Sequence, residues 1–281
     1  MLYYTGRSDA ANIFRIREKQ LIREFLGIGG YVREPEGYMS WQHLTFVTSL
    51  LVVMAVLAVI LGRKNRNRDE KTKNRVLIWS AVVIDSVELF KIVIACVKDG
   101  GPEPIRRLLP LFLCSIMLIA IPLAAFSKGR LREASLDFVL IFGLMSAVLG
   151  TYGAGQNYAC YPVLSIDNVA SGITHSVSGF ACLYIAIAGM TSLKKENIPI
   201  TFAIMGGFCV AAYVANVTLD YNYMFLMRGD GTPYDFFYNL VNGSPVFYPI
   251  TVVGLFLLWI AVFYFAYYQI KRGRAAKRKA E

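Results

Sequence analysis

Long apolar runs separated by short charged segments dominate the chain. Seven runs of 17 to 25 residues fill most of it. They cover residues 41–61, 76–97, 105–126, 134–150, 168–190, 198–218 and 246–270. About 20 apolar residues in a helix cross a hydrocarbon core of ~30 Å, and continuous rather than alternating apolar runs argue against a β-barrel. The pattern predicts an all-α, polytopic membrane bundle of about seven transmembrane helices.

Basic residues gather in every second connection between these runs. Seven Lys and Arg lie in residues 63–75, three in 127–137, two in 193–197 and six in 271–281. Cytoplasmic loops carry an excess of Lys and Arg, so we expect the N terminus outside and the C terminus inside. The formal net charge of +10 then reflects segments that flank an anionic cytoplasmic leaflet, and it requires no nucleic-acid partner.

The residues on either side of the spans form two further segments. Residues 1–40 form an N-terminal arm with Leu21, Ile22 and Phe25 among several Arg and Lys. This spacing favours a short amphipathic helix at the membrane surface, ended by the glycines that follow it, and a disordered tail is the alternative. The predicted organisation is therefore an arm (1–40), a seven-helix transmembrane domain (41–270) and a basic cytoplasmic tail (271–281).

Two reactive side chains lie inside apolar runs. Cys114 and His175 fall at similar predicted depths, about 13 Å and about 10 Å below the exterior surface at the rise of a helix. A lone Cys in a helix is often a small apolar filler, whereas intramembrane His usually has a partner or a function. Together they favour nucleophilic chemistry on a lipid ester over simple packing.

Other polar residues are expected in the same outer half of the membrane. Glu88 and Lys91 lie three residues apart on one helix face, the spacing of an ion pair. Lys91 could also favour a thiolate at Cys114. The remaining candidates are Asn216, Asp220 and Asn222 near the end of the sixth span. We expect a polar pocket between helices, in which Asp220 or Glu88 orients the imidazole and Asn216, Asn222 or Ser115 stabilises an oxyanion.

The cysteines give no sign of a metal site. The five cysteines show no CxxC pairing, and Cys160 alone falls in a predicted exterior loop. We therefore expect no metal, no organic cofactor and no disulfide. The second histidine, His43, opens the first span beside Trp41, where an anchoring role is the more ordinary interpretation.

Several short strings carry a resemblance to a known family. They are the LPLFLC string that ends at Cys114, the isolated His175, Asn216 and the NYMFL string from Asn222. As a set they resemble the YwaF-like bacterial integral membrane family, and the ELFK string from Glu88 to Lys91 is similar to the same segment of its eukaryotic relatives. Those relatives are transmembrane acyltransferases that use a Cys and a His to move a fatty acyl chain onto ether lysophospholipids. The resemblance implies Cys114 as nucleophile and His175 as its base.

The predicted function is thus an integral membrane lipid acyltransferase, or lipid hydrolase, in a bacterial cytoplasmic membrane. Its partners would be a phospholipid or lysophospholipid and the membrane itself, with the oligomeric state left open. The alternative is a seven-helix small-ligand transporter or receptor with a polar pocket in the outer half of the membrane. In that case Lys91, Glu88 and Asn216 contact the ligand, and Cys114 serves only as a small packing residue. No inverted repeat supports a transporter.

Overall fold

The computed structural model describes residues 17–191 and 193–280, and these residues form helices and connecting segments without strands. From residue 41 on, the elements are α2 (Trp41–Asn65), α3 (Glu70–Asp99), η1 (Glu103–Arg107), α4 (Met117–Phe126), α5 (Gly129–Tyr152), α6 (Gly155–Cys160), α7 (Ile166–Ala188), η2 (Lys195–Asn197), α8 (Ile198–Leu219), η3 (Tyr223–Phe225), α9 (Tyr234–Leu240) and α10 (Phe247–Ala280). Within this part of the chain, α2, α5, α7, α8 and α10 are long and apolar enough to cross a membrane. The prediction of an all-α polytopic membrane bundle is confirmed.

Local sequence signals set the beginnings of three long helices. The Ser40 hydroxyl accepts a hydrogen bond from the His43 N–H and caps α2. Asp69 caps α3 in the same way, and the Ser165 hydroxyl caps α7 by accepting from the Asn168 N–H. Such side-chain caps satisfy backbone donors that the first helical turn leaves unpaired. These short polar residues therefore separate the long apolar runs into distinct helices.

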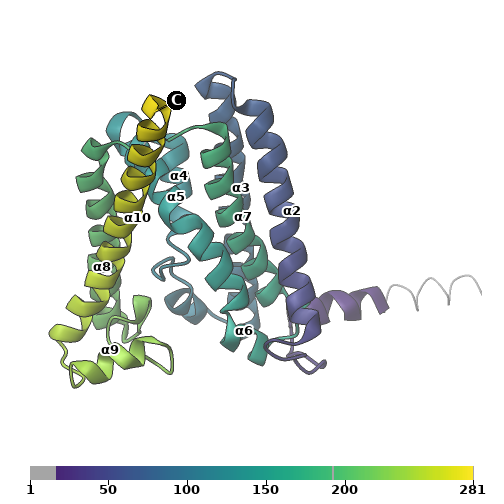
Figure 1. Cartoon of the computed structure of the whole chain (residues 1–281). Helices are drawn as coiled ribbons and strands as arrows, with labels where there is room; N and C mark the ends of the chain where they lie inside the picture. The colour runs from purple at the N-terminus through teal and green to yellow at the C-terminus, as the bar shows by residue number, and fades with distance from the viewer. Residues whose placement is uncertain (1–16, 192, 281) are drawn as a thin grey trace, which may run out of the picture.

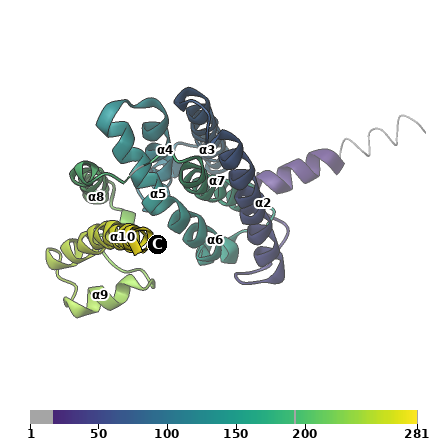
Figure 2. The same ribbon diagram turned by 45° about the horizontal axis from the view of Figure 1, so that its top comes forward.

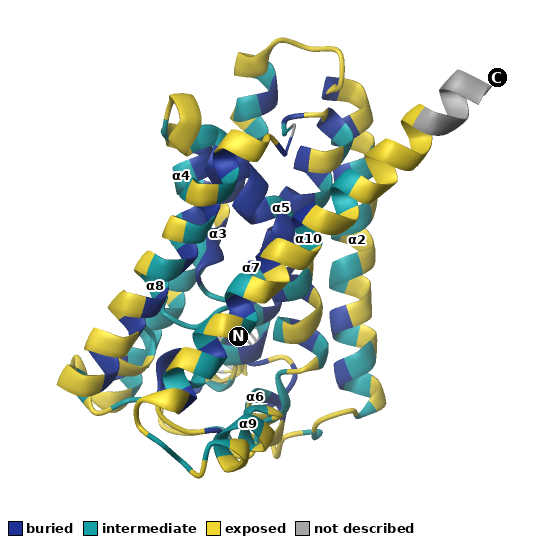
Figure 3. Ribbon diagram, turned by 60° about the vertical axis from the view of Figure 1, so that its left-hand side comes forward, coloured by how far each residue is buried: buried dark blue, intermediate teal, exposed yellow. Residues whose placement is uncertain are grey.

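Helix α7 lies at the centre of the bundle. It packs against α2, α3 and α5, and α4 lies against α3 and α5 (Figure 1). Helices α8, α9 and α10 form a second group beside this bundle, which Figure 2 shows most clearly. Buried residues gather on α5 and α7, whereas α8 and α10 are exposed along much of their length (Figure 3). Exposed apolar side chains on outer helices are the surface that a hydrocarbon layer covers.

The C-terminal end and the basic connections lie where helices that cross the membrane in alternating directions would place them. The C-terminal end of α10 and the α2–α3 connection lie at one end of the bundle, and α6 and α9 lie at the other (Figure 1). We call these the basic end and the α6–α9 end. The excess of basic residues in the connections at the basic end is the asymmetry that the positive-inside rule uses, and the orientation itself stays a prediction.

Small residues let α5 and α7 approach each other closely. A Cβ added to Gly143 of α5 would lie 2.8 Å from the Ser178 carbonyl oxygen and 2.8 Å from the Cys182 Cβ of α7. A Cβ added to Gly179 of α7 would lie 2.7 Å from the Ala147 Cβ of α5. Helix pairs in membranes associate through such small-residue contacts because lipid tails supply no hydrophobic driving force between helices.

A buried carboxylate joins the second group of helices to the bundle. Asp137 of α5 is fully buried and accepts hydrogen bonds from Thr191, from the Asn197 amide at 3.2 Å and from the Tyr264 hydroxyl at 3.1 Å. Tyr264 belongs to α10 and also pairs with Thr201 of α8 at 3.1 Å. A buried carboxylate is tolerated when its oxygens are bonded in this way, so Asp137 fixes α8 and α10 against α5 near the basic end.

The prediction that the third span is one continuous helix over residues 105–126 is wrong in its first half. Residues 103–107 form the short helix η1, residues 108–116 are irregular, and only residues 117–126 are α-helical. Pro110 lacks a backbone N–H and disfavours helical geometry at Leu109. The Ser115 hydroxyl accepts from the Phe112 N–H at 3.0 Å and donates to the Phe112 carbonyl at 3.1 Å, which stabilises a turn instead of a helix.

The second predicted span is a long helix with charges in its middle. Helix α3 has 30 residues, or roughly 45 Å at the rise of a helix, and carries Asp85, Glu88 and Lys91 in its central turns. In the N-terminal arm, residues 17–26 are helical and Leu21 and Ile22 are exposed. The predicted helix at residues 13–16 lies outside the described residues, and the interfacial position of the arm stays a prediction.

The α5–α7 contact leads to a stability prediction. Gly143→Ala should lower the free energy of unfolding by about 1–3 kcal/mol, because the new methyl group meets backbone on α7. Gly206→Ala on α8 is the matched control, since a Cβ there meets nothing within 4 Å. Thermal unfolding in detergent micelles measures both variants. Equal melting temperatures for the two variants would contradict close packing at Gly143.

Candidate functional site

A cavity of about 900 Å³ lies between the central bundle and the second group of helices. Its walls come from α3, α5 and α7 on one side and from α9, α10 and residues 221–225 on the other. The irregular segment that contains Cys114 forms a further wall. The size is in the range of small-molecule and lipid pockets, so the gap between the two groups can hold a ligand.

One stripe of α3 lines this cavity at helical spacing. Its residues are Ile84, Glu88, Lys91, Ala95 and Lys98. Steps of three and four residues place side chains on one face of a helix. Glu88 and Lys91 of the predicted second span therefore face the cavity, whereas Asp85 is exposed and lies outside the cavity lining.

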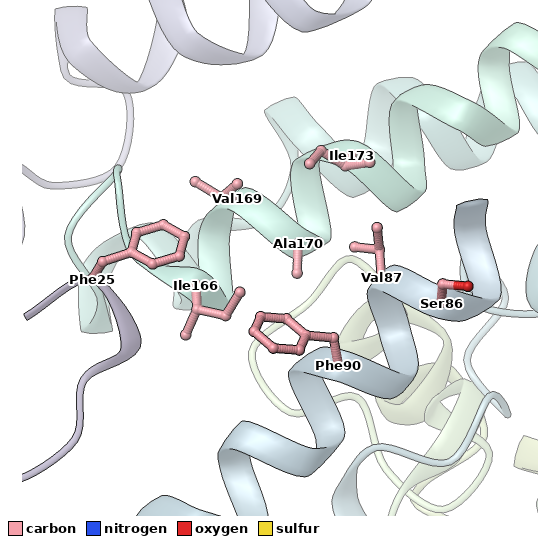
Figure 4. A pocket seen from close by; sticks show the side chains of 8 residues that line it. All are labelled: Phe25, Ser86, Val87, Phe90, Ile166, Val169, Ala170 and Ile173. Atoms are coloured by element: carbon pink, nitrogen blue, oxygen red, sulfur yellow. The ribbon is translucent and has the colours of Figure 1, made fainter. Parts of the chain in front are cut away.

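The opposite faces of α3 and α7 are apolar. Ser171, Thr174, His175 and Ser178 of α7 line the large cavity. A smaller groove lies on the other side of the two helices, and apart from Ser86 its lining is apolar (Figure 4). Val87 and Phe90 of α3 face Ala170 and Ile173 of α7 there. The two helices therefore separate a polar cavity from an apolar groove.

The turn before α4 positions Cys114 in the cavity wall. Residues 113–116 form this turn, and the Ser146 hydroxyl of α5 donates to the Cys114 carbonyl at 2.9 Å. The side chain is of intermediate exposure and lines the cavity. The backbone N–H groups of Cys114 and Ser115 interact with the Cys114 sulfur. The depth inferred from the rise of a helix does not apply to this residue, because residues 108–116 are not helical.

The two histidines have opposite environments. His43 is fully buried, accepts from the Met39 N–H through Nδ1 at 3.1 Å and donates through Nε2 to the Thr151 carbonyl at 3.2 Å. Its ring lies 3.8 Å from the Tyr158 ring, centroid to centroid, so it anchors α2 against other parts of the protein. His175 lines the cavity and forms no hydrogen bond with a described residue.

Close contact with Gly150 fixes the position of the His175 ring. A Cβ added at Gly150 of α5 would overlap the Nδ1, Cε1 and Cγ atoms of His175. The imidazole thus packs directly on the α5 backbone, and only a glycine leaves room for it. Gly150 could not be singled out from the sequence, because a glycine near the end of a predicted span has no distinctive signal.

Glu88 and Lys91 form the ion pair that their spacing predicted. The Lys91 Nζ lies 2.6 Å from a Glu88 carboxylate oxygen, and the side chains are 16% and 12% exposed. The Lys91 charge also interacts with both Cys114 and His175. The thiol, the imidazole and the ion pair therefore share one electrostatic environment, although no hydrogen bond joins Cys114 to His175 within the described chain.

The three candidates near the end of the sixth span lie outside the cavity lining. Asn216 is buried and binds both the N–H and the carbonyl of Tyr223. Asn222 donates to the Arg228 carbonyl and to Asp230, both at 2.8 Å. The two amides therefore stabilise the loop of residues 221–230, and part of this loop lines the cavity.

Asp220 and Ser115 are likewise placed by local backbone structure. Asp220 is exposed and ends α8 in the left-handed conformation, with φ of 51°. The Ser115 hydroxyl is engaged with Phe112, as described above. On the side of the cavity formed by the second group, Tyr234 of α9 interacts electrostatically with Cys114, and no sequence pattern indicated this contact.

The described part of the chain contains no group of three or more His, Cys, Asp or Glu side chains arranged to hold a metal ion. Within that part, the site offers a thiol, an imidazole, an ion pair and several hydroxyl groups. Such groups are suited to proton transfer and to covalent catalysis.

The position of His175 leads to a spectroscopic prediction. Gly150→Ala should displace the imidazole of His175 and leave that of His43 unchanged, because the new methyl group overlaps only the former ring. The chain has two histidines, so histidine-selective isotope labelling and NMR in micelles report on each ring. Gly254→Ala, where a Cβ meets nothing within 4 Å, serves as the control. Unchanged His175 signals in Gly150→Ala would contradict the contact.

Comparison with known proteins places these features in a family. Neither a search of curated proteins nor a search of solved structures gave a match. The TMEM164 family matches residues 38–267, a range that includes the long helices α2 to α8, most of α10 and every residue of the cavity lining. The chain is a multi-pass membrane protein that belongs to the TMEM164 family.

Proposed function

We propose that this protein is a lipid acyltransferase that forms a thioester between Cys114 and an acyl chain taken from a phospholipid. The observation that carries this proposal is the shared cavity of Cys114 and His175, in which the imidazole has no hydrogen-bond partner among described residues. Such an imidazole is free to exchange protons with a substrate. In structures without substrate, catalytic hydrogen bonds are often long and form only in the complex.

The first half-reaction transfers the acyl group to the enzyme. His175 accepts the proton of the Cys114 thiol, and the thiolate attacks the ester carbonyl carbon of the phospholipid. The tetrahedral intermediate collapses as the bond between that carbon and the ester oxygen breaks. His175 then donates the proton to the leaving alkoxide, which departs as a lysophospholipid.

The second half-reaction releases the acyl group. His175 accepts a proton from the hydroxyl of an acceptor lysophospholipid, and the acceptor oxygen attacks the thioester carbonyl. The carbon–sulfur bond breaks, and the proton returns to the Cys114 sulfur. Water in place of the lysophospholipid would make the same site a hydrolase.

Neighbouring groups support both steps. The backbone N–H groups of Cys114 and Ser115 interact with the Cys114 sulfur, so they lie near the position where an oxyanion would develop. The Lys91 charge favours a thiolate at Cys114, and the charge of its partner Glu88 opposes it. Apolar side chains such as Leu113, Met145 and Phe256 line the same cavity and offer a surface for an acyl chain. The resemblance of the LPLFLC string and His175 to the YwaF-like family, and of the ELFK string to its acyltransferase relatives, implies the same roles. The proposed location is a bacterial cytoplasmic membrane.

A ligand-binding transporter or receptor remains the alternative function. It would use the same cavity and the Glu88–Lys91 pair, but it would need no thiol. Substitution of Cys114 therefore separates the two functions.

The direct test is intact-mass analysis after incubation with mixed phospholipids in detergent. The wild type should gain an acyl mass, and Cys114→Ala should gain none because it lacks the nucleophile. His175→Ala should form the adduct more slowly by a factor on the order of 10²–10⁴, the usual contribution of a general base. Cys160→Ala, which removes an exposed cysteine outside the cavity lining, should behave as the wild type.

Two outcomes would reject the proposal. One is an acyl mass that persists in Cys114→Ala. The other is a folded wild-type protein that gains no mass across a broad lipid panel, which would favour the ligand-binding alternative.

A further inference from the structure

Charged side chains line the cavity where α3 ends. Lys98 and Asp99 come from the last turn of α3, and Arg107 ends the neighbouring helix η1. We call this region the cavity mouth. It lies seven residues beyond Lys91 on α3, or about 10 Å along the helix. Cys114 and His175 line the same cavity as this region.

Lys98 is fully engaged by protein groups. Its Nζ donates to the Asp167 carboxylate at 2.8 Å, and the Tyr31 hydroxyl donates to the same oxygen at 2.6 Å. The ammonium also lies over the rings of Tyr31 and Tyr161, at 5.0 Å and 5.5 Å from the centroids. Burial and the adjacent carboxylate raise the pKa of Tyr31, so its hydroxyl stays a donor at neutral pH. Lys98 has little capacity left for a ligand.

The two adjacent arginines of η1 differ in whether protein groups bind their side chains. Arg106 donates to Glu103 at 3.1 Å and to the Leu219 carbonyl at 2.9 Å, and it is not part of the cavity lining. Arg107 is exposed, lines the cavity and forms no ion pair or hydrogen bond within residues 17–191 and 193–280. Arg107 is therefore a cation at the mouth that the protein itself does not neutralise.

The backbone holds Arg107 in this position. Pro104 is buried, and the Leu108 N–H donates to the Pro104 and Ile105 carbonyls, both at 3.1 Å. These bonds close η1 immediately after Arg107. The guanidinium consequently projects from a fixed turn, which lowers the entropic cost of binding a ligand.

We propose that Arg107 binds the phosphate of the glycerophospholipid whose ester carbonyl reaches Cys114. This inference rests on the proposed acyl transfer and adds the recognition of the head group to it. A guanidinium binds phosphate oxygens through two parallel hydrogen bonds, and in a glycerophospholipid only the glycerol backbone separates the phosphate from the ester groups. A phosphate at the mouth therefore directs the ester inward, toward the thiol.

Asp99 limits the charge that the mouth accepts. It is exposed, lines the cavity and has no ion-pair partner within the described chain. A head group with negative charge beyond its single phosphodiester would be repelled by this carboxylate. The mouth is thus suited to phospholipids that carry one negative charge on phosphate, and it disfavours phosphomonoesters such as phosphatidic acid.

The test compares phosphatidylcholine with diacylglycerol, which has the esters but no phosphate, as acyl donors in detergent micelles. Arg107→Gln should raise the half-saturating phosphatidylcholine concentration roughly 10- to 100-fold, the effect of losing a charge-assisted bidentate contact. It should leave the maximal rate and the reaction with diacylglycerol nearly unchanged. Arg107→Lys should restore part of the loss, and Arg106→Gln is the charge-matched control that should change neither value.

A second measurement keeps this inference separate from acyl transfer itself. In the Cys114→Ala background no thioester can form, so native mass spectrometry reports retained phosphatidylcholine alone. Arg107→Gln should reduce that retention and Arg106→Gln should not, whether or not the wild type becomes acylated. Equal retention in the two variants, or an equal effect of Arg107→Gln on phosphatidylcholine and diacylglycerol, would overturn the assignment.

Discussion

The close approach of α5 and α7 is the constraint on which the site depends. Gly143 and Gly179 let the two backbones come so near that a methyl group at either position meets atoms of the other helix. About two turns further along α5 than Gly143, the same approach brings Gly150 against the ring of His175. Because the ring is supported by backbone on one side, it is presented to the cavity on the other. The close packing of α5 against α7 thus also positions the His175 ring in the site.

The polar groups inside the membrane layer are stabilised in two different ways. Asp137 is bonded by three side chains and serves to join α8 and α10 to the bundle. Glu88 and Lys91 neutralise each other but stay on a cavity wall, where their charges reach the thiol and the imidazole. A buried charge is costly unless it is paired. The first arrangement closes the bundle at the basic end, and the second leaves a polar interior that a ligand can enter.

Much of the architecture could be predicted because long apolar runs have few alternatives to transmembrane helices. The Glu88–Lys91 pair could be predicted from spacing alone. Cys114 and His175 line one cavity, and their roles stay predictions. The broken third span could not be predicted from hydropathy, since residues 108–116 are as apolar as a helix. The turn there depends on Pro110 and on the hydroxyl of Ser115, whose partners are visible only in the fold.

Other roles could not be assigned because they depend on partners that are distant in the sequence. Asn216 and Asn222 resemble candidate ligands in the sequence, but their amides bind backbone of the following loop. Arg106 and Arg107 are adjacent and chemically identical, and only the positions of Glu103 and Leu219 distinguish the engaged side chain from the free one. Gly150 carries no side chain, so only the nearby His175 ring reveals its importance.

The most direct measurement is the site and rate of alkylation by a long-chain acyl chloromethyl ketone, followed by peptide mapping of all five cysteines. The reagent combines an apolar chain with an electrophilic carbon, so it requires both a cavity that holds the chain and a reactive thiol. We expect Cys114 to react fastest, ahead of the exposed Cys160. His175→Ala should slow the reaction of Cys114 and leave the rates of the other four cysteines unchanged. Preferential reaction at Cys160, with Cys114 unmodified in the folded protein, would contradict the account.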